Sequence, residues 1–110
     1  EMATRAFALA EKVRDAYLSH DSESLRQLCS ADLFGALKET MNHYEGGSIE
    51  FRMRWVDIDR DGTVHLYVSW KRSGGNGGEM EEAGSGMAVF VISGEPLRVE
   101  KVLRESPFPE

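Results

Sequence analysis

The sequence predicts an α+β fold, in which three N-terminal helices pack on a strongly curved antiparallel sheet of about four strands. Apolar residues recur every three or four positions up to residue 44 and every two positions from residue 48 onward, which are the periods of a helix and of a strand. Glycine-rich or aspartate-rich turns divide the later part of the chain into separate strands. At 110 residues one hydrophobic core is expected, so residues 1–110 are interpreted as a single domain.

Three amphipathic helices are predicted before residue 46. The first covers residues 2–19, where Phe7 and Tyr17 share one side with other apolar residues. Asp21 or Ser22 is placed to cap a short second helix, and Asp32 is placed to cap the third. The third helix has a stripe of apolar residues at helical spacing: Leu33, Phe34, Leu37, Met41 and Tyr44.

The segment after Ser48 is predicted to be a long strand with four apolar residues on one face: Ile49, Phe51, Met53 and Trp55. Beyond Trp55 the apolar positions shift by one, to Val56 and Ile58, which predicts a β-bulge or a bend. Residues 59–62, Asp-Arg-Asp-Gly, are typical of a hairpin turn in which glycine takes a positive φ. The return strand is expected to place Val64, Leu66, Val68 and Trp70 on one face, and Thr63, His65, Tyr67 and Ser69 on the other.

A third strand, from Met80 to Ile92, is predicted to lie inside the sheet because residues 87–92 are apolar on both faces. A turn at Ser93 and Gly94 leads to a last strand that ends at Leu103. Long strands with shifted apolar positions imply a strongly bent sheet. Such a sheet, wrapped over a helix, is expected to form a cone with an open mouth.

The segment from Ala16 to Phe34 reads A-Y-L-S-H-D-S-E-S-L-R-Q-L-C-S-A-D-L-F. Together with the Asp/Gly hairpin and the final return from Ser93 to Leu103, it resembles the nuclear transport factor 2-like superfamily. This cystatin-like cone is shared by ketosteroid isomerases, SnoaL-type cyclases and many bacterial proteins. The resemblance implies an apolar pocket between the helices and the curved sheet, and dimers formed through the outer face of the sheet.

The expected function is a non-catalytic module that binds a small apolar ligand or a protein partner. Its pocket would be lined by apolar side chains from both layers: Phe7, Tyr17, Phe34, Tyr44, Phe51, Trp55, Trp70 and Phe90. The alternative is a small isomerase, dehydratase or cyclase that uses an isolated ionisable group in an apolar cavity. The polar candidates for that role are His65, Tyr67 and Asp32, beside the hydroxyls of Tyr17 and Tyr44. No acidic residue falls at an inward position of the predicted strands, which favours the non-catalytic hypothesis.

The spacing Asp57-x-Asp59-x-Asp61-Gly62 is similar to the opening of a calcium loop. Val68 stands at the twelfth position, where such a loop needs a bidentate glutamate, and the flanking segments are predicted to be strands. A structural turn is therefore favoured over a calcium site. The histidines do not share metal-ligand spacing on one element, so neither a metal nor another cofactor is predicted.

The formal net charge of −6 argues against nucleic acid as a partner, because binding the phosphate backbone requires a basic surface. No apolar run reaches the roughly 20 residues that a membrane span needs. Cys29, in a helical apolar pattern, is expected to be a buried residue rather than a nucleophile. Apolar residues on both faces of several strands predict a homodimer through the sheet. The opening Glu1-Met2-Ala3 is interpreted as an altered or trimmed start, so no compartment is predicted.

Overall fold

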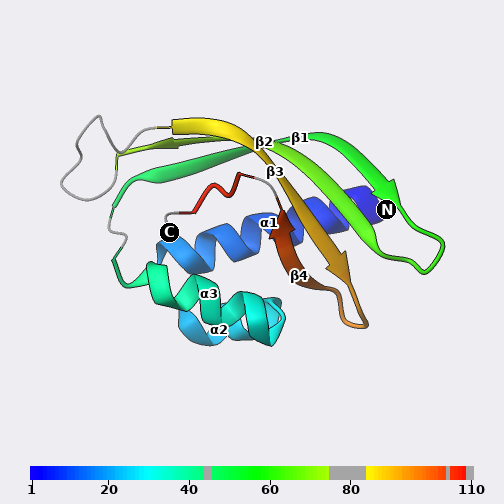
Figure 1. The fold of residues 1–110 in the computed structure, drawn as a ribbon, viewed down its shortest axis with the longest axis horizontal. Helices are drawn as coiled ribbons and strands as arrows, with labels where there is room; N and C mark the ends of the chain where they lie inside the picture. Colours follow the sequence, from blue (N-terminus) through cyan, green and yellow to red (C-terminus); the bar gives the residue numbers. More distant parts are fainter. Residues whose placement is uncertain (44–45, 75–83, 104, 109–110) are drawn as a thin grey trace.

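The computed structural model describes residues 1–43, 46–74, 84–103 and 105–108. In this part of the chain, helices α1 (Met2–Leu18), α2 (Ser22–Leu28) and α3 (Ala31–Met41) cover one face of an open antiparallel sheet (Figure 1). The sheet consists of β1 (Ser48–Ile58), β2 (Val64–Ser73), β3 (Gly84–Ser93) and β4 (Arg98–Leu103), in the order β1-β2-β3-β4. The predicted class, with three helices and a curved four-stranded sheet, is confirmed.

The helices begin at capping residues. Asp21 caps α2, as predicted, because its carboxylate accepts a hydrogen bond from the backbone N–H of Ser24 at 3.2 Å. The prediction that Asp32 caps α3 is wrong. Ser30 is the cap, since its hydroxyl oxygen accepts from the backbone N–H of Leu33 at 3.2 Å. Asp32 lies exposed in the first turn, where a negative charge is favourable beside the helix N-terminus.

Ser30 also joins the helical layer to the sheet. Its hydroxyl donates to the carbonyl oxygen of Glu100 at 2.8 Å, and its backbone N–H donates to the carbonyl oxygen of Val99 at 2.9 Å. Next to it, Cys29 forms an isolated parallel bridge with Val99 of β4. The link between α2 and α3 is therefore held against β4 by backbone and side-chain hydrogen bonds.

Replacing Ser30 by alanine is expected to lower the free energy of unfolding by about 1–2 kcal/mol, because α3 loses its cap and the Glu100 carbonyl loses a donor. Urea denaturation followed by circular dichroism measures this change. The matched control is Ser24→Ala, whose hydroxyl donates to the exposed Asp21 carboxylate, and we expect an effect within about 0.5 kcal/mol. Equal effects of the two substitutions would contradict the assigned role of Ser30.

The sheet contains the predicted bulge, one residue before the expected position. The register between β1 and β2 shifts between Met53 and Trp55, so that Trp55 pairs with Tyr67 and Val56 pairs with Leu66. Directly paired residues of an antiparallel sheet share a face. Trp55 and Tyr67 therefore lie on the outer face, away from the helices, and Val56 lies on the inner face.

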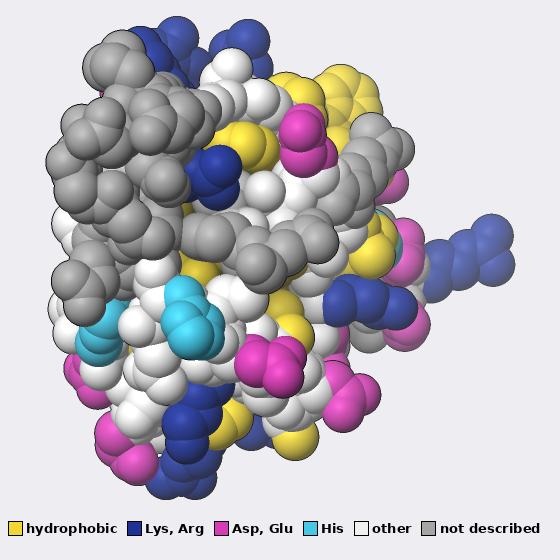
Figure 2. Space-filling model, turned by 60° about the vertical axis from the view of Figure 1, so that its left-hand side comes forward, with side chains coloured by type: hydrophobic (Ala, Val, Ile, Leu, Met, Phe, Trp, Pro, Cys, Tyr) yellow, Lys and Arg dark blue, Asp and Glu magenta, His cyan; other side chains and the backbone are white. Residues whose placement is uncertain are grey.

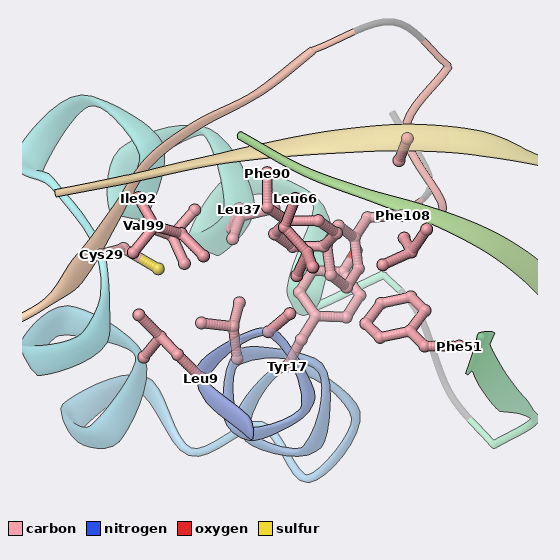
Figure 3. Close-up of a cluster of buried hydrophobic side chains, with 14 of the residues drawn as sticks. Leu9, Tyr17, Cys29, Leu37, Phe51, Leu66, Phe90, Ile92, Val99 and Phe108 are labelled. Carbon is pink, nitrogen blue, oxygen red and sulfur yellow. The ribbon is translucent and has the colours of Figure 1, made fainter. Parts of the chain in front are cut away.

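The core lies between the inner face of the sheet and the helices (Figure 3). As predicted, Val64, Leu66, Val68 and Trp70 of β2 share the buried inner face. Strand β3 lies between β2 and β4, and its residues 88–92 are buried on both faces, which confirms its predicted inner position. The expected start of this strand at Met80 lies outside the described residues. None of the described helices is long and apolar enough to cross a membrane.

Candidate functional site

The aromatic residues that the sequence assigned to a pocket lie in several environments. Tyr17, Phe51, Trp70 and Phe90 are buried in the core, where the rings of Phe51 and Phe90 meet edge to face at 5.5 Å between centroids. Phe7 and Phe34 are half-buried and pack against that core. The position of Tyr44 lies outside the described residues. Trp55 is 63% exposed, so the expectation that it lines the interior is corrected.

The polar candidates lie away from the interior. Asp32 is exposed on α3, and His65 and Tyr67 are half-buried on the outer face of the sheet. Among the described residues, the buried set contains no charged side chain. The hydroxyl of Tyr17 reaches inward and shares a hydrogen bond of 2.8 Å with the Thr40 hydroxyl. The described interior thus offers a tyrosine and a cysteine as titratable groups.

Cys29 is buried, and loss of hydration raises the pKa of its thiol from 9.0 to about 12. We expect native protein at pH 8 to react with iodoacetamide about 100-fold more slowly than protein unfolded in urea, because the thiolate is the reactive form. Mass spectrometry of the labelled protein gives both rates. Rapid labelling in the native state would contradict the buried position of this residue.

The same pKa shift predicts the pH dependence of stability. The unfolded thiol loses its proton near its ordinary pKa of 9.0, whereas the folded thiol keeps it up to about 12. The contribution of Cys29 to stability is therefore complete below pH 9 and decreases as the pH rises through this window. Cys29→Ala is expected to remove that part of the alkaline decrease, which thermal melts from pH 8 to pH 11 would measure.

The aspartates of the possible calcium loop form a hairpin turn. The backbone N–H of Asp59 donates to the Thr63 carbonyl oxygen at 2.8 Å, and Gly62 has a φ of 88°, which favours glycine. The backbone N–H of Thr63 donates to the Asp61 carboxylate at 3.1 Å, which lowers the pKa of Asp61. In the part of the chain that the structure describes, no three His, Cys, Asp or Glu side chains converge on a possible metal position.

A second group of apolar side chains lies on the outer face of the sheet. Trp55, Tyr67, Val89 and Leu103 form one row across the four strands. We call this row, with the neighbouring Met87 and Val91, the outer-face cluster. Trp55, Met87 and Leu103 are 63%, 42% and 38% exposed, whereas Val89 and Val91 are buried although they are not part of the helix-facing core. The outer face therefore has a small core of its own with an exposed apolar rim.

Charged residues flank the outer-face cluster with different signs on its two sides. Arg52 and Lys71 lie toward one end of β1 and β2, together with Glu50, and Asp57 lies toward the other end with Lys101 nearby on β4. All five are exposed or half-exposed. On edge strand β1, the charge thus changes from positive to negative across the position of Trp55.

A further candidate is the interior end under the C-terminal segment 105–108, which we call the tail segment. The indole N–H of Trp70 donates to the Glu105 carbonyl oxygen at 3.2 Å, and the Arg72 guanidinium donates to the Pro107 carbonyl oxygen at 3.1 Å. Phe108 is 3% exposed, and its ring lies 4.5 Å from that of Tyr17, as Figure 3 shows. The tail segment therefore inserts an aromatic side chain into the core.

Two glycines of β3 make room for the tail segment. Gly84 and Gly86 lie opposite Arg72 and Trp70 in the sheet. A methyl group at Gly86 would collide with the Glu105 carboxylate and lie 3.0 Å from the Trp70 ring. The glycine at this position therefore permits both the inward Trp70 ring and the chain that passes beneath it.

The tail segment is held with little net free energy. Its two hydrogen bonds to β2 contribute about 1 kcal/mol each, and burial of Phe108 contributes about 2–3 kcal/mol. Ordering four residues costs about 1–2 kcal/mol for each backbone unit. These gains and costs are of similar size. Release of the segment is therefore expected to be much easier than unfolding of the sheet.

An open groove of about 330 Å³ extends from Phe108 to the surface. Its walls come from α3, from β4 and from the tail segment, and include Leu33, Leu37, Thr40 and Val102. The groove and the position of Phe108 are thus continuous, and the groove connects the interior end to solvent.

The described residues define an open α+β domain with two candidate binding surfaces, the outer-face cluster and the interior end. On the side of the molecule shown in Figure 2, basic and acidic side chains are interspersed. No protein-family model matches the chain, and neither a curated protein nor a solved structure matches it.

Proposed function

We propose that the protein is a non-catalytic interaction module that forms a homodimer through the outer-face cluster of a nuclear transport factor 2-like domain. The observation that carries the proposal is the exposure of Trp55, an aromatic side chain directed away from the core at 63% accessibility. Large apolar residues that gather on one exposed face are typical of protein interfaces, where tryptophan is enriched. The parallel bridge between Cys29 and Val99 is compatible with the cone-shaped arrangement that the sequence resemblance implies.

The charges support a second copy of the chain as the partner. A two-fold axis along the row of Trp55, Tyr67, Val89 and Leu103 would bring two outer faces together. Arg52 lies one inter-strand pair to one side of this row, and Asp57 lies one pair to the other side. The rotation would therefore set Arg52 of each copy opposite Asp57 of the other. A surface that is complementary to itself in this way favours self-association.

Association through the face is favoured over association through the edge of the sheet. Strand β1 is an edge strand, but its bulge between Met53 and Trp55 interrupts the regular series of hydrogen-bonding groups. Bulges and charged side chains are features that disfavour the pairing of edge strands.

A charge exchange tests the proposal. Arg52→Asp and Asp57→Arg are each expected to raise the dimer dissociation constant about tenfold, because each places like charges opposite one another. The double variant is expected to return to the wild-type value, since both pairs are restored with the signs reversed. Sedimentation equilibrium over a range of concentrations measures the constants, with Lys12→Glu on exposed α1 as the control. A wild-type protein that stays monomeric at all accessible concentrations would refute the proposal.

The proposed absence of catalysis is supported by the composition of the interior. Proton-transfer enzymes need an acid or a base within reach of the reacting atom. His65, Tyr67 and Asp32 lie on the outer face or on exposed α3, and the buried set among the described residues contains no carboxylate or imidazole. The isomerase, dehydratase or cyclase alternative therefore has less support than binding.

A further inference from the structure

We infer that the interior end is a binding site for aryl-alkyl carboxylates, and that the tail segment occupies this site until such a ligand displaces it. The inference does not depend on the outer-face cluster, which lies on the opposite face of the sheet. It rests on the way in which the tail segment is held, on the groove beside it and on the chemistry of the groups that it contacts.

The contacts resemble those of a ligand more than those of a secondary structure element. Residues 105–108 form no strand pairing with the sheet. Instead, two side chains of β2, Trp70 and Arg72, donate hydrogen bonds to two carbonyl oxygens of the tail segment. These donors point to the same side because they are two residues apart on one strand. They can serve any acceptor of suitable position, since the tail segment offers them backbone oxygens and no special side chain.

The position of Phe108 defines the apolar half of the ligand. Its ring is nearly fully buried and lies against the Tyr17 ring at 4.5 Å. Beyond it, the groove along α3 leads to solvent past Leu33 and Thr40. An aromatic ring that enters through this groove reaches the position of Phe108 without disturbing the pairing of β2 with β3.

The spacing between the two halves defines the linker. In the tail segment, the ring of Phe108 and the carbonyl carbon of Pro107 are separated by three atoms, which are the Cβ, the Cα and the amide nitrogen of Phe108. A phenyl ring joined by three methylene groups to a carboxylate, as in 4-phenylbutyrate, has the same spacing. A carboxylate is a better partner than a carbonyl for the guanidinium of Arg72, because the hydrogen bond gains an opposite charge.

Displacement of the tail segment is the measurement that tests the inference. In the full chain, 4-fluorophenylalanine is placed at position 108, and its ¹⁹F resonance is followed during titration with 4-phenylbutyrate. We expect the resonance of the buried ring to decrease and that of a solvent-exposed ring to increase with saturation. Benzoate, which has no linker, and butyrate, which has no ring, are expected to leave the spectrum unchanged at the same concentrations. A buried resonance that persists at every concentration of 4-phenylbutyrate would overturn the inference.

Two variants of the full chain test the two halves separately. Phe108→Ala is expected to bind 4-phenylbutyrate at least about tenfold more tightly than wild type in calorimetry, because the competing ring is gone. If this variant does not fold, Phe108→Leu takes its place. Arg72→Gln is expected to weaken binding of 4-phenylbutyrate about tenfold while leaving the uncharged 4-phenyl-1-butanol unaffected. Equal effects on the charged and uncharged probes would overturn the assignment of the carboxylate to Arg72.

Discussion

Replacing Phe90 by alanine is expected to lower the free energy of unfolding by about 3–5 kcal/mol. Phe90 lies on inner strand β3, has no exposed surface and packs edge to face against Phe51 at 5.5 Å. Its neighbours across the two ladders, Leu66 and Val102, are held by strand pairing and cannot easily collapse into the vacated space. Since small domains are stable by roughly 5–15 kcal/mol, this one substitution removes a large fraction of the total.

Chemical denaturation of Phe90→Ala, compared with wild type and with Phe90→Leu, measures the effect. The leucine variant keeps most of the apolar volume, so we expect it to lose about 1–2 kcal/mol. Both measurements should be made at the same low protein concentration, because association would add to the apparent stability. A loss below about 1 kcal/mol for the alanine variant would contradict the central position of this ring.

Replacing Trp55 by alanine is expected to raise the dissociation constant of the proposed dimer by about 30-fold or more, equivalent to about 2 kcal/mol. The indole lies in the middle of the outer-face cluster and is the most exposed of the large apolar side chains among the described residues. Tryptophan side chains at the centre of an interface commonly contribute most of the binding free energy. The stability of the separated monomer is expected to change by less than about 0.5 kcal/mol, because the side chain is exposed there.

Ile58→Ala is the matched control for this prediction. Ile58 belongs to the same edge strand and is 50% exposed, but it pairs with Val64, whose side chain lies on the inner face. Its truncation removes exposed apolar surface without touching the outer-face cluster. Sedimentation equilibrium of the two variants is expected to separate them by at least tenfold in dissociation constant. Equal constants would show that general hydrophobicity, rather than this face, drives association.

The order and type of the elements could be predicted because they depend on local periodicity. The change from a helical to a two-residue repeat near Ser48 separates the two layers, and the continuous apolar run of residues 88–92 places β3 inside the sheet. The hairpin turn at residues 59–62 was also predictable, since Gly62 is needed where φ is positive. These features require no knowledge of distant parts of the chain.

The position of the bulge could be predicted to within one residue, and that residue decides the role of Trp55. Both tryptophans follow an alternating pattern, but Trp70 is buried whereas Trp55 lies on the opposite face. The extra residue of a bulge reverses the direction of the side chains that follow it. The best candidate for an interface residue was therefore assigned to the interior.

The sequence by itself determined the class of the fold, the number and order of the elements and the polarity of most of their faces, because these follow from interactions between near neighbours. The tertiary structure decided three further features. Ser30 rather than Asp32 caps α3, since the carbonyl of Glu100 lies within reach of its hydroxyl. The tail segment lies in the interior because Trp70 and Arg72 offer it donors. Trp55 faces outward because the register between β1 and β2 shifts just before it, and register is a property of two strands together.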